Sequence, residues 1–402
     1  MLRTRTRLLV LVLSAACTDQ HPEPAGELQP EWTSDPAYQF GDALAGNALF
    51  GFVPYLKVSP DGQRVFVLEY DLARVSVWSP EGRLLLDLGG PGEGPGDLMG
   101  PYRIHLADSS FYVRDQVRFT WFSDDGTVLR TVPNPPTSIS YQGFQIQVRA
   151  LLADDSFLGR PNIPASIREG LQGDDPIDRT PVLRVRESPR GWIQEPVAWI
   201  WARDSRLVIH RDGGVLFAAQ PYSEADYYGM DAGAGTVVIA RSAGDNLEPG
   251  EAELMEIGAA GDTVWRRWLK FRPVRPTRAM VDAAIDRVVG IIERSEEGTP
   301  GFLGGRSARE VAEDALHTPD YLPAVRRFTL ASSGHVWLES HESMDTLRVW
   351  HSIERGDTES PPRRVLLPEW FQVMDATNTH VWGVWTDELD INYIVGRRLT
   401  LR

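Results

Sequence analysis

A turn followed by a short apolar run recurs along this chain at a nearly constant interval. The runs centre on Val65, Phe111 and Phe157, each 46 residues after the one before, then on Val237, and finally on Val336 and Val381, which are 45 residues apart. Around the first centre, further apolar runs with Pro-Gly or Asp-Gly turns cover residues 55–58, 75–78 and 84–88. Four short strands in roughly 40–50 residues are typical of one blade of a β-propeller. A single four-stranded sheet leaves both faces uncovered, whereas blades packed around a ring cover one another.

Two intervals are longer than the period, and each contains an insertion. Between the centres at 157 and 237, the runs 207–210 and 215–218 predict an added hairpin. The second long interval contains a helical insertion over residues 277–317. Its apolar residues recur at helical spacing, and Ser307 and Glu310 form a capping box that opens a second helix. The chain is therefore predicted to be all-β, a six-bladed β-propeller with the helical insertion between blades 4 and 5. A hairpin that forms its own blade would make seven.

The last repeat lacks one strand. After Val381 the only clear strand covers residues 393–401, while the spare segment 37–42 stands near the beginning of the chain. We expect this N-terminal strand to complete the last blade, which closes the ring and protects an exposed sheet edge. The propeller would then cover residues 37–402.

The first residues have the pattern of an export signal. Three arginines precede the apolar run 8–13, and small residues lead to Cys17, the only cysteine of the chain. This pattern resembles a bacterial lipoprotein signal over residues 1–17, in which Cys17 would be lipidated. The alternatives are a plain secretory signal and an N-terminal anchor helix. Residues 18–36 are polar and rich in proline, as a flexible tether would be. The expected location is extracytoplasmic, on a bacterial membrane, in the periplasm or at the cell surface.

The composition excludes several classes of function. There are 41 Lys and Arg residues against 56 Asp and Glu, so the net charge of −15 disfavours binding to nucleic acid. One cysteine allows neither an internal disulfide nor a thiolate metal cluster. No HExxH, GxSxG or EF-hand pattern is present. No catalytic residue and no metal ligand can be assigned, and no cofactor is expected, although calcium held by single carboxylates of several blades stays open.

The glycine-rich segment from Gly89 to Leu98 and the string LPAVRRFTLASSGHVWLES near the C-terminus carry a family resemblance. They are similar to an uncharacterised bacterial family of six-bladed β-propeller lipoproteins, NHL-like and also broadly TolB-like. The resemblance implies a fold and a location at the cell envelope. That family has no agreed activity, so no functional residue follows from it.

Propellers usually bind ligands where the innermost strands converge on the central channel. Tyr55, Arg103 and Arg326 stand near the starts of expected innermost strands and are the candidate binding residues at the channel mouth. The function that this pattern favours is a membrane-anchored binding or scaffold module for a peptide, a glycan or an envelope protein. The alternative is a propeller enzyme, either a calcium-dependent hydrolase of lactonase type or an NHL-type lyase. The helical insertion is either a structural cap or a lid or docking surface for a partner.

Overall fold

The computed structural model describes most of the chain beyond its first thirty residues. The described residues are 31–41, 49–107, 109–163, 179–201, 206–211, 214–244, 246–298, 303 and 305–401. Cys17, the predicted signal and residues 18–30 of the predicted tether lie outside them. Strand β1 begins at Glu31, so residues 31–36, which the sequence assigned to the tether, belong to a strand.

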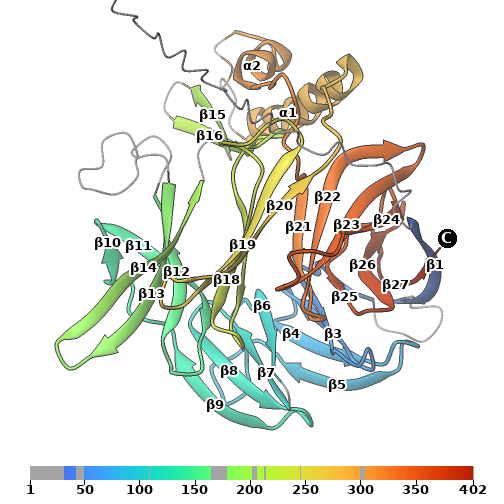
Figure 1. Ribbon diagram of the computed structural model, residues 1–402. Helices are drawn as coiled ribbons and strands as arrows, with labels where there is room; N and C mark the ends of the chain where they lie inside the picture. Colours follow the sequence, from blue (N-terminus) through green and yellow to red (C-terminus); the bar gives the residue numbers. More distant parts are fainter. Residues whose placement is uncertain are drawn as a thin grey trace, which may run out of the picture.

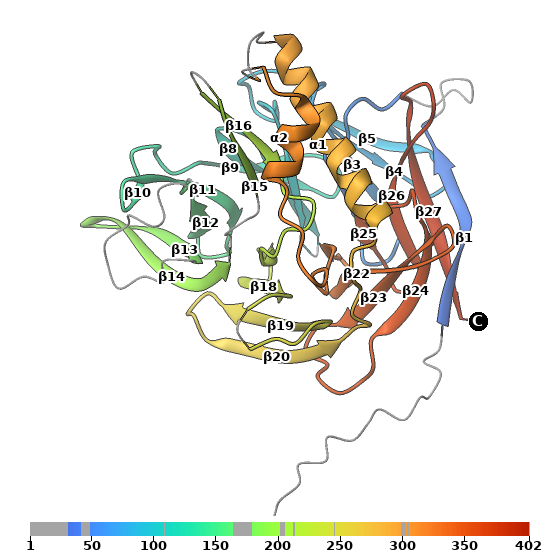
Figure 2. The ribbon, with the colours of Figure 1, turned by 90° about the horizontal axis from the view of Figure 1, so that it is seen from above.

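Four separate sheets and one larger sheet follow one another around a ring, so the all-β, propeller-like fold is confirmed (Figures 1 and 2). The first sheet contains β2 (Tyr55–Val58), β3 (Val65–Glu69), β4 (Arg74–Trp78) and β5 (Leu84–Gly89). The second contains β6 (Arg103–Leu106), β7 (Ser110–Arg114), β8 (Arg118–Ser123) and β9 (Val128–Pro133). In both, each strand pairs antiparallel with the next, as the repeat predicted.

The other two separate sheets are longer or irregular. The third contains β10 (Ser140–Tyr141), β11 (Phe144–Leu151), β12 (Phe157–Pro161), β13 (Arg179–Ser188) and β14 (Gly191–Trp201). The fourth contains β17 (Tyr227–Asp231), β18 (Thr236–Arg241), β19 (Glu251–Gly258) and β20 (Thr263–Lys270).

The eight-stranded sheet joins the end of the chain to its beginning. Its order runs through β21 (Arg327–Leu330), β22 (His335–Met344), β23 (Leu347–Glu354), β24 (Arg363–Pro368), β1 (Glu31–Phe40), β27 (Asn392–Leu401), β26 (His380–Thr386) and β25 (Asp375–Ala376). β1 pairs antiparallel with β27 over most of its length. With β24 it pairs in parallel, and only at Glu31 and Trp32. The N-terminal strand therefore completes the group formed by β25–β27, as expected, although it covers Glu31–Phe40 and not 37–42.

The core lies between adjacent sheets. One apolar cluster joins β1 to the first sheet and to β26, through residues that include Phe40, Trp78 and Trp382. Another joins the first sheet to the second, through residues that include Phe66 and Phe111. Their rings lie 5.0 Å apart in an edge-to-face contact. The aromatic residues of the predicted strands thus serve mainly to pack one sheet against the next.

The two predicted insertions pack against each other. The hairpin consists of β15 (Arg206–Arg211) and β16 (Gly214–Ala219), and the helical segment of α1 (Arg278–Gly298) and α2 (Ala308–Ala315). Ser307 and Glu310 form the predicted capping box of α2. The apolar stripe of α1, with Ile285, Val288 and Ile292, is buried against Leu207 and Ile209 of the hairpin and against α2. Both helices lie at one end of the ring, above the sheets in Figure 1 and nearest the viewer in Figure 2. Within the described residues, neither helix is long and apolar enough to cross a membrane.

Phe40 tests whether the N-terminal strand is part of the core. Its side chain is 2% exposed and lies 5.5 Å, between ring centroids, from Trp78 of the first sheet. We expect Phe40→Ala to lower the free energy of unfolding by about 3–5 kcal/mol, because it leaves a cavity between sheets. Leu129→Ala, at a residue that is 56% exposed, is the control and should cost less than about 0.5 kcal/mol. Urea unfolding of the two variants measures both values. Equal stabilities would show that β1 does not close the ring.

Candidate functional site

A cavity of about 690 Å³ lies on the axis of the ring. Its walls come from the innermost strands β2, β6, β17 and β21 and from residues 372–374, which precede β25. Three of the four separate sheets and both halves of the eight-stranded sheet therefore contribute to it. The turns that follow these innermost strands also line it, whereas the helices attach to the opposite end, where β21 begins. The cavity is the place where most of the ring converges.

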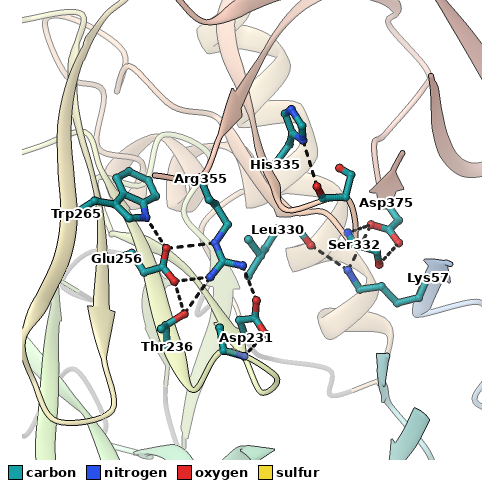
Figure 3. Close-up of polar contacts among 12 residues, drawn as sticks. Lys57, Asp231, Thr236, Glu256, Trp265, Leu330, Ser332, His335, Arg355 and Asp375 are labelled. Atoms are coloured by element: carbon teal, nitrogen blue, oxygen red, sulfur yellow. Dashed lines mark hydrogen bonds and ion pairs between the residues drawn. The ribbon is translucent and has the colours of Figure 1, made fainter. Parts of the chain in front are cut away.

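A buried carboxylate holds three segments together at one side of the cavity (Figure 3). Asp375 is fully buried and accepts hydrogen bonds from the Val58 backbone N–H at 2.7 Å and from the Ser332 backbone N–H at 2.7 Å. The Ser332 hydroxyl donates a further bond at 2.6 Å. The Lys57 ammonium lies 3.4 Å from the same carboxylate and donates to the Leu330 carbonyl at 2.9 Å. The first sheet is thus tied to both ends of the eight-stranded sheet.

A second polar cluster ties the fourth sheet to the eight-stranded sheet. The guanidinium of Arg355, just after β23, forms ion pairs with Asp231 at the end of β17 and with Glu256 of β19. Glu256 also accepts hydrogen bonds from the Thr236 hydroxyl and the Trp265 indole N–H. Figure 3 shows the contacts of both clusters, one around Arg355 and one around Asp375. The carboxylates of Asp375 and Glu256 each accept four contacts from donors of the chain, and Asp231 accepts from Arg355 and from the Ala234 N–H.

The electrostatics of these clusters keep the groups charged. Burial lowers the pKa of Lys57, but Asp375 outweighs it, and the pKa is raised above its ordinary value. Burial raises the pKa of Glu256, but the hydrogen bonds from Arg355 and Thr236 hold it below its ordinary value. The pKa of Asp231 is lowered in the same way, by the Ala234 N–H and by Arg355.

These carboxylates do not fit a calcium site. Calcium in proteins takes six to eight oxygen ligands, mostly carboxylates and carbonyls that face the ion. The carboxylates of Asp231, Glu256 and Asp375 are all committed to cations or N–H donors. Among the described residues, no group of three or more His, Cys, Asp or Glu side chains is arranged to hold a metal ion.

Two of the three predicted site residues lie together at the cavity. Tyr55 and Arg103 both line it, and the guanidinium carbon of Arg103 lies 5.5 Å from the centre of the Tyr55 ring. Arg103 comes from β6 and Tyr55 from β2, so the contact joins the first two sheets. Their role in binding stays a prediction.

Arg326 is placed differently. It precedes β21 and pairs with the buried carboxylate of Glu339 at 2.8 Å, and its backbone carbonyl accepts a bond from the Tyr227 hydroxyl. It does not line the cavity. It stands just before an innermost strand, as predicted, and its side chain is paired with Glu339, which is fully buried on β22; its role in binding stays a prediction.

Sequence reasoning missed His105. This residue stands two positions after Arg103 on β6, so both side chains lie on one face of the strand. Its ring stacks on Tyr112 at 4.6 Å and hydrogen-bonds to the backbone of Arg149, while its Nε2 has no partner in the described residues. Burial, with smaller effects from Arg103 and Lys57, lowers the pKa of His105 to about 3. Its alternation with Arg103 along a predicted strand was the available signal.

Comparison with known proteins identifies no family. No family model matches the chain, and no curated protein matches it. Solved structures share its outline at very low identity. A member of the DUF4221 family from Bacteroides vulgatus is 8% identical with a TM-score of 0.46, covering 93% of this chain and 100% of the other. A putative exported protein from Bacteroides fragilis is 8% identical with a TM-score of 0.42, covering 92% and 95%. The PQQ-bound aldose sugar dehydrogenase from Streptomyces coelicolor is 14% identical with a TM-score of 0.36, covering 92% and 98%. Likeness at this level says nothing about what this chain binds.

The contacts of Asp375 predict that replacing this one carboxylate by an amide strongly destabilises the protein. Asp375→Asn should lower the free energy of unfolding by about 3 kcal/mol or more, because Lys57 is left nearly buried and without its counter-ion. Asp87→Asn is the matched control, since Asp87 is 45% exposed and its partner Arg74 keeps Glu69. That variant should lie within about 0.5 kcal/mol of the parent. Equal losses in urea unfolding would contradict the role given to Asp375.

His105 predicts a pH dependence of stability. Because its pKa in the folded chain, about 3, lies below the ordinary value of 6.5, only the unfolded chain takes up a proton between these values. Its contribution to stability is complete above pH 6.5 and is lost as the pH falls toward 3. His341 and His351, with pKa values of about 4 and 3, act in the same direction. The melting temperature of the parent should fall when the pH is lowered from 7.5 to 4.5. His105→Phe should make this fall smaller. An unchanged pH profile would show that His105 titrates normally.

Proposed function

We propose that this protein is an extracytoplasmic, six-bladed β-propeller, anchored to a bacterial membrane through lipidated Cys17, that binds a ligand in its central cavity. The location is supported by the export-signal pattern of residues 1–17. Thirteen residues separate Cys17 from β1 in the sequence, so the ring would stand close to the membrane.

The count of six rests on how β1 joins the eight-stranded sheet. β1 pairs with β24 at two positions only, and with β27 from Trp32 to Phe40. The large sheet divides there into two units of four strands, β21–β24 and β25–β27 with β1. Among the described strands, the hairpin β15–β16 pairs with no other and packs on the helices, which supports counting it as an insertion rather than a seventh blade.

The observation that carries the binding function is the cavity itself. Its volume of about 690 Å³ lies within the range of small-molecule and cofactor sites, roughly 300–1,000 Å³. Residues from most of the ring converge on it, as in a site that recognises one molecule from several sides. The carboxylates of Asp231, Glu256 and Asp375 are paired with cations of the chain and serve the structure of the ring. We therefore propose a binding module without enzymatic activity, whose ligand is a peptide, a glycan or an exposed segment of an envelope protein.

Blocking the cavity tests this proposal. Ala107 lies on the rim, in the turn between β6 and β7, and is exposed. Ala107→Trp places a large ring at the opening, and we expect it to abolish any binding found in calorimetric titrations of the full chain with a panel of oligosaccharides and short peptides. Ala260→Trp, in an exposed turn that does not line the cavity, is the control and should leave binding unchanged. Binding that survives Ala107→Trp would place the ligand elsewhere.

Metal analysis separates the module from the enzyme alternative. The full chain, purified without chelator, should contain less than a tenth of an equivalent of calcium by native mass spectrometry, because the cavity carboxylates are already paired. A stoichiometric calcium ion, lost on mutation of Asp231 or Asp375, would contradict the binding-module proposal and favour a calcium-dependent hydrolase.

A further inference from the structure

Two arginines stand directly opposite each other next to the cavity. In the ladder between β6 and β7, Arg103 pairs in register with Arg114. Residues directly opposite in an antiparallel pair place their side chains on the same face, where like charges destabilise the sheet. Arg149 of β11 adds to this positive charge. The pKa of Arg114 is lowered chiefly by burial and then by the charge of Arg149, and the pKa of Arg149 is lowered chiefly by burial, with Arg103 acting in the same direction.

Among the described residues, no carboxylate forms an ion pair with these arginines, although the charge of Asp115 acts on Arg114. Arg103 and Arg114 take part in no side-chain hydrogen bond and no ion pair, and Arg149 donates only to the Gln147 side chain at 3.1 Å. The Nε atoms of all three are buried without an acceptor, as is Nη1 of Arg114. Stacking on tyrosine is their main contact: Arg103 lies on Tyr55 and Arg114 on Tyr102, the latter at 4.1 Å.

Other arginines of this protein have carboxylate or carbonyl partners for their guanidinium groups. Arg355 has Glu256 and Asp231, Arg241 has Asp226 and Glu253, and Arg74 has Glu69. Arg267, which has no carboxylate, still donates to two backbone carbonyls. A chain of net charge −15 has many carboxylates available for such pairs. Leaving buried guanidinium groups without acceptors costs folding free energy, and a function that needs the free donors explains why they are kept.

We propose that Arg103, supported by Arg114 and Arg149, binds an oxyanion of the cavity ligand: a carboxylate, phosphate or sulfate group. This inference rests on the proposed binding function and assigns the chemical class of its ligand. Arg103 lines the cavity and would contact the anion, while Arg114 and Arg149 do not line it and act through their charge. Guanidinium groups suit this role because two parallel N–H groups match the geometry of an oxyanion.

Neighbouring groups fit the same ligand. The Lys57 ammonium lies 5.9 Å from the centre of the Tyr55 ring but is already paired with Asp375, so Arg103 supplies the unpaired positive charge on this side of the cavity. His105, on the same face as Arg103, also lines this wall. Tyr55, Tyr228 and residues 372–374, which precede β25, supply wall for the rest of a ligand. A ligand with one oxyanion and an uncharged body, such as an acidic sugar or a phosphorylated sugar, matches these walls.

The test uses small probes on the full chain. Titration calorimetry with glucuronate and glucose 6-phosphate separates carboxylate from phosphate, and glucose is the uncharged counterpart. We expect at least one charged probe to bind at least tenfold more tightly than glucose, more weakly as salt rises, and to raise the melting temperature beyond the effect of sodium chloride at equal ionic strength.

Variants separate a binding role from a structural one. Arg103→Gln should weaken binding of the charged probe at least tenfold, and Arg103→Lys should restore part of it. Arg64→Gln is the matched control, because Arg64 lines the cavity but is already paired with Asp124. Arg114→Gln should raise the melting temperature of the free protein, since it removes a like charge opposite Arg103, and at the same time weaken the charged probe.

The outcomes divide clearly. If all three probes bind equally and Arg103→Gln changes none of them, the oxyanion inference is wrong, while sensitivity to Ala107→Trp would still support the cavity as a binding site. If Arg114→Gln lowers the melting temperature of the free protein, the arginine pair has a structural role and the inference is overturned. Stabilisation that sodium chloride reproduces fully would show an adventitious ion only.

Discussion

The structure depends on a carboxylate that is removed from solvent where the ring closes. Asp375 receives donors from the first sheet, through Val58 and Lys57, and from the turn after β21, through Ser332. A ring of sheets has to bring the beginning and end of its chain together, and loop-closure entropy opposes this. A buried carboxylate that finds all its hydrogen-bond donors in a single arrangement makes other strand registers costly, because they would leave it without those donors. β1 adds the backbone ladder to β27 and the aromatic contact to Trp78 at the same junction.

This use of carboxylates explains the chemistry left in the channel. Asp375, Asp231 and Glu256 neutralise Lys57 and Arg355, and these pairs join the first and the fourth sheet to the eight-stranded sheet. The wall formed by β6 and its neighbours has no such pairing, so its arginines keep free donors in a strongly acidic protein. The cavity therefore combines a rigid, neutralised side with a cationic side. Such a division suits a preorganised site, because the ligand meets donors that need no rearrangement.

The sequence predicted those features that depend on local patterns. The strands of the first sheet, the hairpin, the two helices and the Ser307 capping box all follow from turn residues, alternation or helical spacing. The glycine-rich connection after β5 is also local: Gly89 has φ +93°, and a Cβ there would lie 2.8 Å from the Ala73 carbonyl oxygen. These signals come from residues close together in the chain.

The features that the sequence did not reveal depend on register and long-range contact. Arg326 pairs with Glu339, which lies on another strand. The pairing of Arg103 with Arg114 requires the β6–β7 register, which a one-residue shift would abolish. The packing of α1 on the hairpin joins two insertions that are separated in sequence by the fourth sheet. Each of these facts depends on distances between strands, which apolar periodicity alone does not contain.

The central claim is that the cationic wall of the channel binds an oxyanion. A crystal structure of the full chain grown with glucuronate or glucose 6-phosphate tests it most directly. The account predicts an oxyanion oxygen within about 2.7–3.2 Å of the Arg103 guanidinium, inside the cavity and with the Lys57–Asp375 pair intact. A carboxylate of the chain itself on Arg103, or a probe bound only outside the cavity, would contradict it.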